Sequence, residues 1–448
     1  MRTVAAASLI ALLFAAFLLG HRAAPVDFTI PEPLPEILRD TKHLEPAAFE
    51  IEQPLAEWDH LTPPAAPTVR LVAQATPPPT FSRPKSIATD RERKPTIPVS
   101  RPRVSFVSNL DFDAVPTGHL SQLNWHAGET LHGAAIPTPV LVAQGETDGG
   151  TLCVTAAVHG DELNGIESVR ELMYGINTSR LSGRVIGVPI VNLQGFQRHS
   201  RYLSDRRDLN RFFPGNPRGS VASRMAHSFF NDIIRHCDYL VDLHTGSFHR
   251  TNLPQLRANL HNPGVLALTE GFGATTILHS EGGIGTLRRA AVDAGIPAVT
   301  LEAGEPLRLE EAAVEHTVKA LYTLMNTLGM YPKLSLWGNP APTYYSSHWV
   351  RAEQGGMLFS RVKLGRKVRE GDVLGTVTDP INNEQTEVLA PFSARVIGMA
   401  VNQFVMPGYA TFHLAAEADI DDVIEVEPGH ESGVEVAVAD TAGNERSE

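Results

Sequence analysis

Two histidines and two glutamates carry the main chemical signal in this chain of 448 residues. His159 and Glu162 lie three residues apart in the segment HGDELNG, and His244 lies in the segment DLHTG. A catalytic zinc ion takes three protein ligands and keeps a fourth position for water, and two histidines with one glutamate are a known ligand set. We therefore predict that His159, Glu162 and His244 bind one Zn²⁺ ion per chain.

Glu302, in the segment LEAG, is the predicted acid and base of the reaction. Bound zinc lowers the pKa of its water toward about 7, but cleavage of an amide also needs a base for the water proton and an acid for the leaving amine. Glu302 can serve as both, with Glu305 as a weaker alternative. Asp242, two residues before His244 on the same strand face, is expected to orient an imidazole ring.

An arginine-rich stretch, residues 200–215, is predicted to bind the substrate. The planar guanidinium group of arginine pairs with a carboxylate in a forked geometry and also stabilises a developing oxyanion. We assign the substrate carboxylate to Asn210 and Arg211, and the oxyanion to Arg201. Arg206 fits a solvated basic loop instead.

The predicted site residues follow short apolar segments with the composition of buried strands. Such β-branched segments are typical of parallel or mixed sheets covered on both faces, and here they are residues 152–158, 185–193, 239–243 and 298–301. Sites in these sheets gather at the carboxyl ends of the strands. Because three of the segments run directly into His159, His244 and Glu302, we expect these side chains to converge on one rim.

Amphipathic patterns between these segments predict helices. Apolar residues recur at helical spacing over 166–176 and over 221–233, and Ser220 precedes the second pattern as an N-cap. A third pattern covers 309–328 and stops at Gly329. The alternation predicts an α/β fold in which a mixed sheet is flanked by helices.

The site segments resemble those of the succinylglutamate desuccinylase and aspartoacylase family and occur in the same order; they are residues 159–165, 207–215, 242–246 and 301–304. This family belongs to the zinc carboxypeptidase-like superfamily, and the chain is similar to its predicted-deacylase branch. The resemblance implies a zinc carboxypeptidase-like catalytic domain over residues 104–331. It also implies the roles given above: zinc binding by His159, Glu162 and His244, base catalysis by Glu302, carboxylate binding by Asn210 and Arg211, and polarisation of the scissile carbonyl by Arg201.

One residue of the family pattern, an arginine upstream of the catalytic glutamate, has no counterpart at the matching spacing in this chain. Family members hold a substrate carboxylate with a further arginine upstream of the catalytic glutamate. Arg288 and Arg289 lie in that region without the matching spacing. The acyl group and the amine of the substrate therefore stay open.

A glycine-punctuated stretch, residues 332–415, is predicted to form a small all-β domain. Its segments 368–375 and 388–391 resemble the barrel-sandwich fold of biotinyl and lipoyl carriers. Carriers present a lysine at a hairpin tip, whereas the equivalent residues 379–385 contain none, which argues against a carrier role. In the family this domain caps the active site, so the resemblance implies a lid that restricts the substrate.

The two ends of the chain are predicted to lie outside the folded domains. Residues 1–24 contain an apolar run that indicates an export signal, either cleaved or kept as a membrane anchor. Residues 25–103 hold 16 of the 33 prolines and fit an extended disordered linker, and residues 416–448 fit an acidic disordered tail. We expect an exported protein, periplasmic or membrane-anchored and facing the periplasm.

The composition excludes several classes of protein. With 42% hydrophobic and 20% charged residues, the chain has enough apolar material for a large core. Its net charge of −12 leaves no basic field for a nucleic-acid partner. Cys153 and Cys237 are too few for a disulfide scaffold. We expect buried thiols at both positions, with a disulfide as the alternative if the two strands are neighbours.

These observations predict a zinc-dependent amidohydrolase that acts on a linear amide, removing the acyl group from an N-acyl amino acid or a similar small amide. The alternative is an exported zinc carboxypeptidase that trims peptides, cell-wall peptides among them. A third hypothesis is a tethered binding module that has kept the pocket without catalysis. The oligomeric state is left open.

Overall fold

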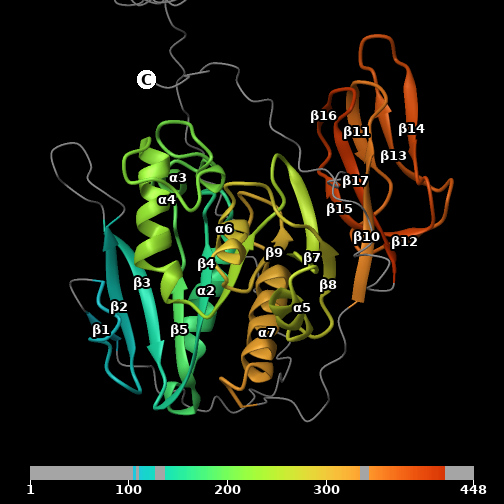
Figure 1. Ribbon diagram of the computed structural model, residues 1–448. Helices are drawn as coiled ribbons and strands as arrows, with labels where there is room; N and C mark the ends of the chain where they lie inside the picture. The colour runs from blue at the N-terminus through green and yellow to red at the C-terminus, as the bar shows by residue number, and fades with distance from the viewer. Residues whose placement is uncertain (1–103, 107–109, 127–136, 333–342, 419–448) are drawn as a thin grey trace, which may run out of the picture. The chain divides into compact units, whose positions relative to one another are not determined.

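The structure is a computed structural model that describes residues 104–106, 110–126, 137–332 and 343–418 (Figure 1). The export segment, the proline-rich segment and the acidic residues 419–448 lie outside these ranges, so the predictions for them stay predictions. Within the described ranges, no helix combines the length and the apolar character needed to cross a membrane.

Four central strands of the large sheet confirm the apolar segments singled out from the sequence. They are β4 (Thr147–Ala156), β5 (Ser182–Val188), β6 (Tyr239–His244) and β9 (Ala298–Gly304), in the order β5-β4-β6-β9 with every neighbouring pair parallel. Successive residues of β4 face opposite sides, since Cys153 and Val154 belong to different apolar clusters. The strands are apolar throughout because both faces are covered.

Further strands extend this sheet on both sides, and the sequence analysis named none of them. Beyond β5 the order continues through β3 (Pro137–Gln144), β2 (Leu120–His126) and β1 (Val104–Phe106). Beyond β9 come β7 (Arg250–Ala258), which is antiparallel to β9, and β8 (Thr276–His279), which is parallel to β7. The sheet is therefore mixed.

Helices cover both faces of the sheet (Figure 1). Side chains of α2 (Leu163–Gly175), α5 (Pro263–Glu270) and α7 (Glu311–Thr327) pack in one apolar cluster with alternate residues of the central strands. Side chains of α4 (Val221–Asp232) and α6 (Leu287–Asp293) pack in a second cluster on the opposite face. The remaining helices are short: η3 (Thr178–Arg180), α3 (Leu193–Gln197), η4 (Leu209–Arg211) and η5 (Ile234–His236).

The predicted helix ends agree closely with the structure. The Ser220 side chain accepts a hydrogen bond from Ser223 N at the start of α4, as an N-cap does. Helix α7 starts two residues later than predicted, and Gly329 follows it with a φ of 71°, a conformation that favours glycine.

The C-terminal part of the described chain is all β. Its strands are β10 (Thr343–Arg351), β11 (Gly356–Ser360), β12 (Lys367–Val368), β13 (Val373–Thr378), β14 (Gln385–Leu389), β15 (Ala394–Ala400), β16 (Phe404–Val405) and β17 (Ala410–Glu417). A second sheet has the order β14-β13-β11-β16, and β13 and β14 form the predicted hairpin without a lysine in its loop.

The other C-terminal strands continue the large sheet and close on β7. Pairing runs from β7 through β8, β10, β17 and β15, and β15 pairs with β7 again, which makes a closed ring of five strands. One residue from each of these strands packs in a single apolar cluster: Leu253, Leu278, Tyr345, Ile397 and Ala415. The C-terminal strands are thus joined to the catalytic sheet by backbone pairing.

The expectation of free thiols was wrong. Cys153 in β4 and Cys237, two residues before β6, form a disulfide with Sγ atoms 1.98 Å apart. The parallel register that pairs Leu152 with Tyr239 brings the two cysteine Cα atoms to 5.7 Å, within the range that a disulfide requires. The neighbouring-strand alternative is confirmed.

Candidate active site

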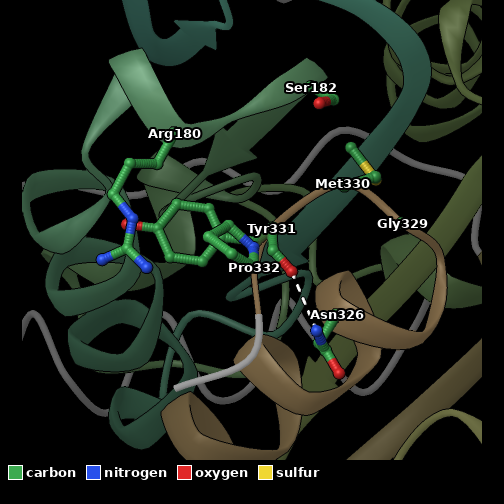
Figure 2. A pocket seen from close by; sticks show the side chains of 7 residues that line it. All are labelled: Arg180, Ser182, Asn326, Gly329, Met330, Tyr331 and Pro332. Carbon is green, nitrogen blue, oxygen red and sulfur yellow. Dashed lines mark hydrogen bonds between the residues drawn. The ribbon is translucent and has the colours of Figure 1, made fainter.

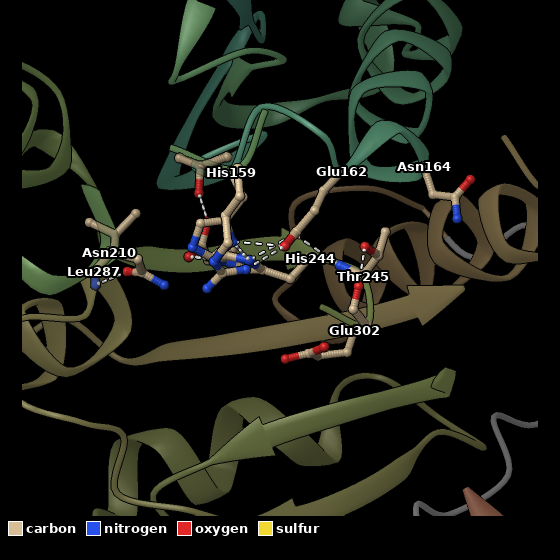
Figure 3. A network of polar contacts seen from close by, with 12 residues as sticks. His159, Glu162, Asn164, Asn210, His244, Thr245, Leu287 and Glu302 are labelled. Atoms are coloured by element: carbon tan, nitrogen blue, oxygen red, sulfur yellow. Dashed lines mark hydrogen bonds and ion pairs between the residues drawn. The ribbon is translucent and has the colours of Figure 1, made fainter. Parts of the chain in front are cut away.

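The three predicted metal ligands converge at the carboxyl ends of β4 and β6 (Figure 3). His159 and Glu162 lie in the turn between β4 and α2, and His244 is the last residue of β6. All three are buried, and each offers one ligand atom within 4.8 Å of the other two. His159 Nδ1 lies 2.7 Å from Glu162 Oε1, and His244 Nδ1 lies 3.0 Å from Glu162 Oε2.

Carboxylates hold the outer nitrogens of both imidazole rings. Asp242 Oδ2 lies 2.7 Å from His244 Nε2, and Asp208 Oδ1 lies 3.1 Å from His159 Nε2. Thr155 Oγ1 in turn donates to Asp242 Oδ1 over 2.6 Å. The role predicted for Asp242 is seen in these contacts, whereas that of Asp208 was missed.

This arrangement fits a metal cation. An imidazole that donates through Nε2 to a carboxylate presents a lone pair at Nδ1. The Nδ1 atoms of His159 and His244 face each other at 3.2 Å, with the Glu162 carboxylate beside both. Three electron-pair donors thus share a space screened from water, and a cation between them would offset their mutual repulsion.

The charges of the site also favour a cation. Burial raises the pKa of Glu162, but the neighbouring His159 and His244 rings outweigh this and hold its pKa well below the ordinary value. Burial lowers the pKa of His244, but Asp242 and Glu162 outweigh this and raise it well above the ordinary value. The carboxylates favour positive charge at this place, and that charge can be a proton or a metal ion.

Arg201, the residue predicted to stabilise the oxyanion, lies against the ligand set. Its Nη1 lies 3.4 Å from Glu162 Oε1, and its Nη2 lies 3.1 Å from Asp208 Oδ2. Burial lowers the pKa of Arg201, but Asp208 and Glu162 outweigh it, so the pKa rises and the guanidinium stays charged. A fixed positive group therefore stands beside the three ligand atoms.

Asn210 and Arg211 lie nearby on η4, and the contacts of Asn210 show a structural role. Asn210 Oδ1 accepts a hydrogen bond from Leu287 N over 2.8 Å at the start of α6 (Figure 3). The Arg211 side chain is 41% exposed and lies 3.9 Å from Asp208 Oδ2. Arg211 is thus the more available of the two for a substrate.

Glu302 lies within β9, directly opposite His244 in the register of the parallel pair. Its carboxylate accepts a hydrogen bond from Asn252 Nδ2 over 2.8 Å and lies 3.2 Å from Arg257 Nε. Both partners come from β7 and were not predicted. Glu305, the alternative, pairs instead with Arg308 at 2.9 Å.

The two arginines upstream of Glu302 differ in their surroundings. Arg289 pairs with Glu281 and Asp293 at 3.0 Å on the outside of α6. Arg288 is buried and donates to Ser280 O over 2.6 Å. Burial and the neighbouring Arg257 lower its pKa to about 10.

A separate pocket of about 420 Å³ lies at the amino end of β5 (Figure 2). It is lined by Arg180, Ser182, Asn326, Gly329, Met330, Tyr331 and Pro332, and Arg180 lies 5.4 Å from the centre of the Tyr331 ring. No predicted site residue contributes to it. Because β5 and β4 are parallel, this pocket and the ligand set are at opposite ends of the strands.

Comparison with known proteins finds the same family that the sequence motifs resemble. Residues 148–328 match the model of the succinylglutamate desuccinylase/aspartoacylase catalytic domain. The chain is 27% identical over 291 residues to an N-alpha-acetyl-L-2,4-diaminobutyric acid deacetylase of Halomonas elongata, covering 62% of this chain and 83% of that protein.

Solved structures agree in fold. A succinylglutamate desuccinylase/aspartoacylase from Rhodobacter sphaeroides matches with a TM-score of 0.62 and 24% identity, covering 71% of this chain and all of that one. The product-bound ectoine utilization protein EutE (DoeB) from Ruegeria pomeroyi matches with a TM-score of 0.60 and 23% identity, covering 68% and 98%. Residues 148–328 of this chain thus carry a catalytic domain of the succinylglutamate desuccinylase/aspartoacylase family.

Proposed function

We propose that the protein is a zinc-dependent hydrolase that removes the acyl group from an N-acyl amino acid or a similar small amide. The observation that carries this proposal is the buried convergence of His159, Glu162 and His244, with both imidazole rings oriented by carboxylates. The family of the chain and its similarity to a deacetylase of an acetylated diamino acid support the same reaction class.

In this proposal His159, Glu162 and His244 would hold the zinc ion, which would supply Lewis acidity and lower the pKa of water toward neutrality. Glu302 takes a proton as the water oxygen attacks the acyl carbon, and delivers it to the amine nitrogen as the carbon–nitrogen bond breaks. Arg201 donates to the carbonyl oxygen as negative charge develops on it.

Binding of the substrate carboxylate falls to Arg211 and Asn210 in this proposal. The exposed Arg211 guanidinium can form the forked pair that a carboxylate prefers. Asn210 Oδ1 is already engaged by Leu287 N, so the amide nitrogen is the part of Asn210 left for a ligand.

The contacts of the C-terminal strands near the ligand set are an argument for a small substrate. Strand β15 pairs with β7, and Tyr409 Oη donates to Phe248 O over 2.6 Å in the loop that follows His244. We propose that the C-terminal strands, from Thr343 onward, narrow the entrance, which favours small amides over peptides.

The test is a metal analysis of the purified full-length chain, followed by an assay of amine release. The panel contains N-acetyl and N-succinyl amino acids, N-alpha-acetyl-diaminobutyrate first, beside peptides with free carboxyl termini. We expect about one zinc per chain and release of the amine from a small N-acyl amino acid. Cleavage of the peptides alone would favour the carboxypeptidase, and metal-loaded protein that cleaves nothing would favour a binding module.

The Glu302→Gln variant tests the catalytic assignment. We expect it to keep the metal and to lose turnover by about 10²-fold or more, because proton transfer contributes that much. Glu305→Gln is the matched control, since Glu305 pairs with Arg308 outside the ligand set. Equal activity of the two variants would remove Glu302 from the mechanism.

A further inference from the structure

The loop after His244 has a backbone conformation that its residues do not favour. Phe248 and His249 have φ angles of 53° and 60°, both in the left-handed region. For residues other than glycine this conformation is unfavourable, and it persists only where the surroundings enforce it. Such strain is concentrated at functional sites.

Three hydrogen bonds from the C-terminal strands hold this loop. Tyr409 Oη donates to Phe248 O over 2.6 Å, Val401 N donates to His249 O over 2.9 Å, and Gln403 Nε2 donates to His249 O over 3.0 Å. The donors all come from residues 401–409, the stretch between β15 and β17. We call this stretch the strap.

A buried cation fixes the strap. The Arg250 guanidinium lies 4.4 Å from the centre of the Tyr409 ring and 5.3 Å from that of Trp349. Arg250 Nε also donates to Ala410 O over 3.1 Å, and the residue is only 6% exposed. A desolvated cation packed between two aromatic rings makes a strong contact, so the Tyr409 hydroxyl is held in a defined place.

At its other end the loop reaches the catalytic arginine. The Arg201 guanidinium carbon lies 5.3 Å from the centre of the Phe248 ring, while its nitrogen atoms face Glu162 and Asp208. Phe248 is 38% exposed, so its ring lies at the protein surface beside Arg201. The partly exposed ring therefore makes a cation–π contact with the guanidinium.

We propose that Phe248 is a positioning residue that holds the Arg201 guanidinium in line with the acyl carbonyl, and that the strap sets the position of Phe248 through its backbone. This inference rests on the role proposed above for Arg201. It makes the C-terminal strands part of the catalytic apparatus as well as a lid.

A double-mutant cycle tests whether Phe248 positions Arg201. Because the guanidinium would lose the contact that holds it in place, Phe248→Ala should lower kcat about ten-fold with little change in KM. Phe248→Tyr, which keeps a ring, should recover most of the loss, whereas Phe248→Leu, which keeps only apolar bulk, should not. In an Arg201→Ala background, Phe248→Ala should have almost no further effect. Additive losses, or a change in KM alone, would overturn the proposal.

Two further measurements test the inference and do not depend on catalytic activity. Phenylglyoxal labelling of Arg201, followed by peptide mass spectrometry, should be faster in Phe248→Ala than in the unmodified protein. Hydrogen–deuterium exchange should be faster for residues 245–252 and for Val401 in Tyr409→Phe, and unchanged in α7. Unchanged labelling and exchange would refute the positioning role even in an active enzyme. If the protein is inactive but both the labelling and the exchange change as expected, the proposed function is refuted, whereas the positioning of Phe248 by the strap is supported.

Discussion

Each histidine of the ligand set is hydrogen-bonded to a separate carboxylate. These carboxylates fix the orientation of the imidazole rings and so affect how well the histidines can bind a metal ion. Asp208 fixes the His159 ring, and Asp242, itself held by Thr155, fixes the His244 ring. Groups that orient a metal-binding histidine typically account for 10–100-fold in metal affinity or activity.

We therefore expect Asp208→Asn to weaken zinc binding about 10–100-fold, because an amide orients the His159 ring less well and removes a negative charge. Competition with a chromogenic chelator measures the affinity. Asp205→Asn is the matched control, since Asp205 contacts Arg207, through its backbone N at 3.2 Å and its side chain at 3.8 Å, and neither histidine of the ligand set. Equal affinities in the two variants would contradict the role of Asp208.

The site was predictable where its parts are close in sequence. His159 and Glu162 share one turn, and Asp242 lies on the same strand face as His244, so spacing and strand periodicity were enough to place them. Asp208 is 49 residues from His159 and reaches it only because the loop after α3 comes back to the turn that follows β4. Contacts of that kind follow from tertiary packing, which local patterns do not encode.

At the scale of elements, β7 shows why part of the fold was missed. Its sequence, RTNLPQLRA, mixes polar side chains with Pro254, and a proline within a strand removes a backbone donor. The structure places Pro254 at an irregularity in the pairing with β9, between Asn252 and Gln255. The partners of Glu302 were missed together with the strand.

The pair β10 and β17 carries a pH-dependent element. His413 stacks on Trp349 with ring centres 4.4 Å apart, and neither ring nitrogen of His413 has a hydrogen-bond partner in the described part of the chain. Burial lowers the pKa of His413 well below its ordinary value, and Arg257, His348 and Arg250 lower it further. His413 is therefore neutral in the folded protein near neutral pH.

A histidine that is kept neutral by folding binds its proton only in the unfolded chain as the pH falls below about 6.5. The free energy of unfolding should then decrease by up to about 1.4 kcal/mol per pH unit below that value. His413→Phe should reduce this slope, measured by urea unfolding between pH 7 and 5. His126→Gln, at the exposed end of β2 and not among the groups that act on His413, is the control. Equal slopes in both variants would rule out His413 as the origin.

For the whole molecule, the disulfide joins two halves of the central sheet. Cys153 and Cys237 are 84 residues apart, and closing so long a loop restricts the unfolded chain. Replacing both cysteines with alanine should lower the free energy of unfolding by about 2–4 kcal/mol. Reductant should shift the unmodified protein toward the variant and leave the variant unchanged. A stability that responds to neither change would contradict this role.

The closed ring of β7, β8, β10, β17 and β15 has a consequence for any attempt to divide the protein. Three of its five strands come from the C-terminal part, so a fragment ending at Pro332 would expose unpaired backbone N–H and C=O groups along β7 and β8. Bare strand edges recruit strands from other chains. Truncation at this point would therefore produce a self-associating protein, because the C-terminal strands that pair with β7 and β8 would be missing.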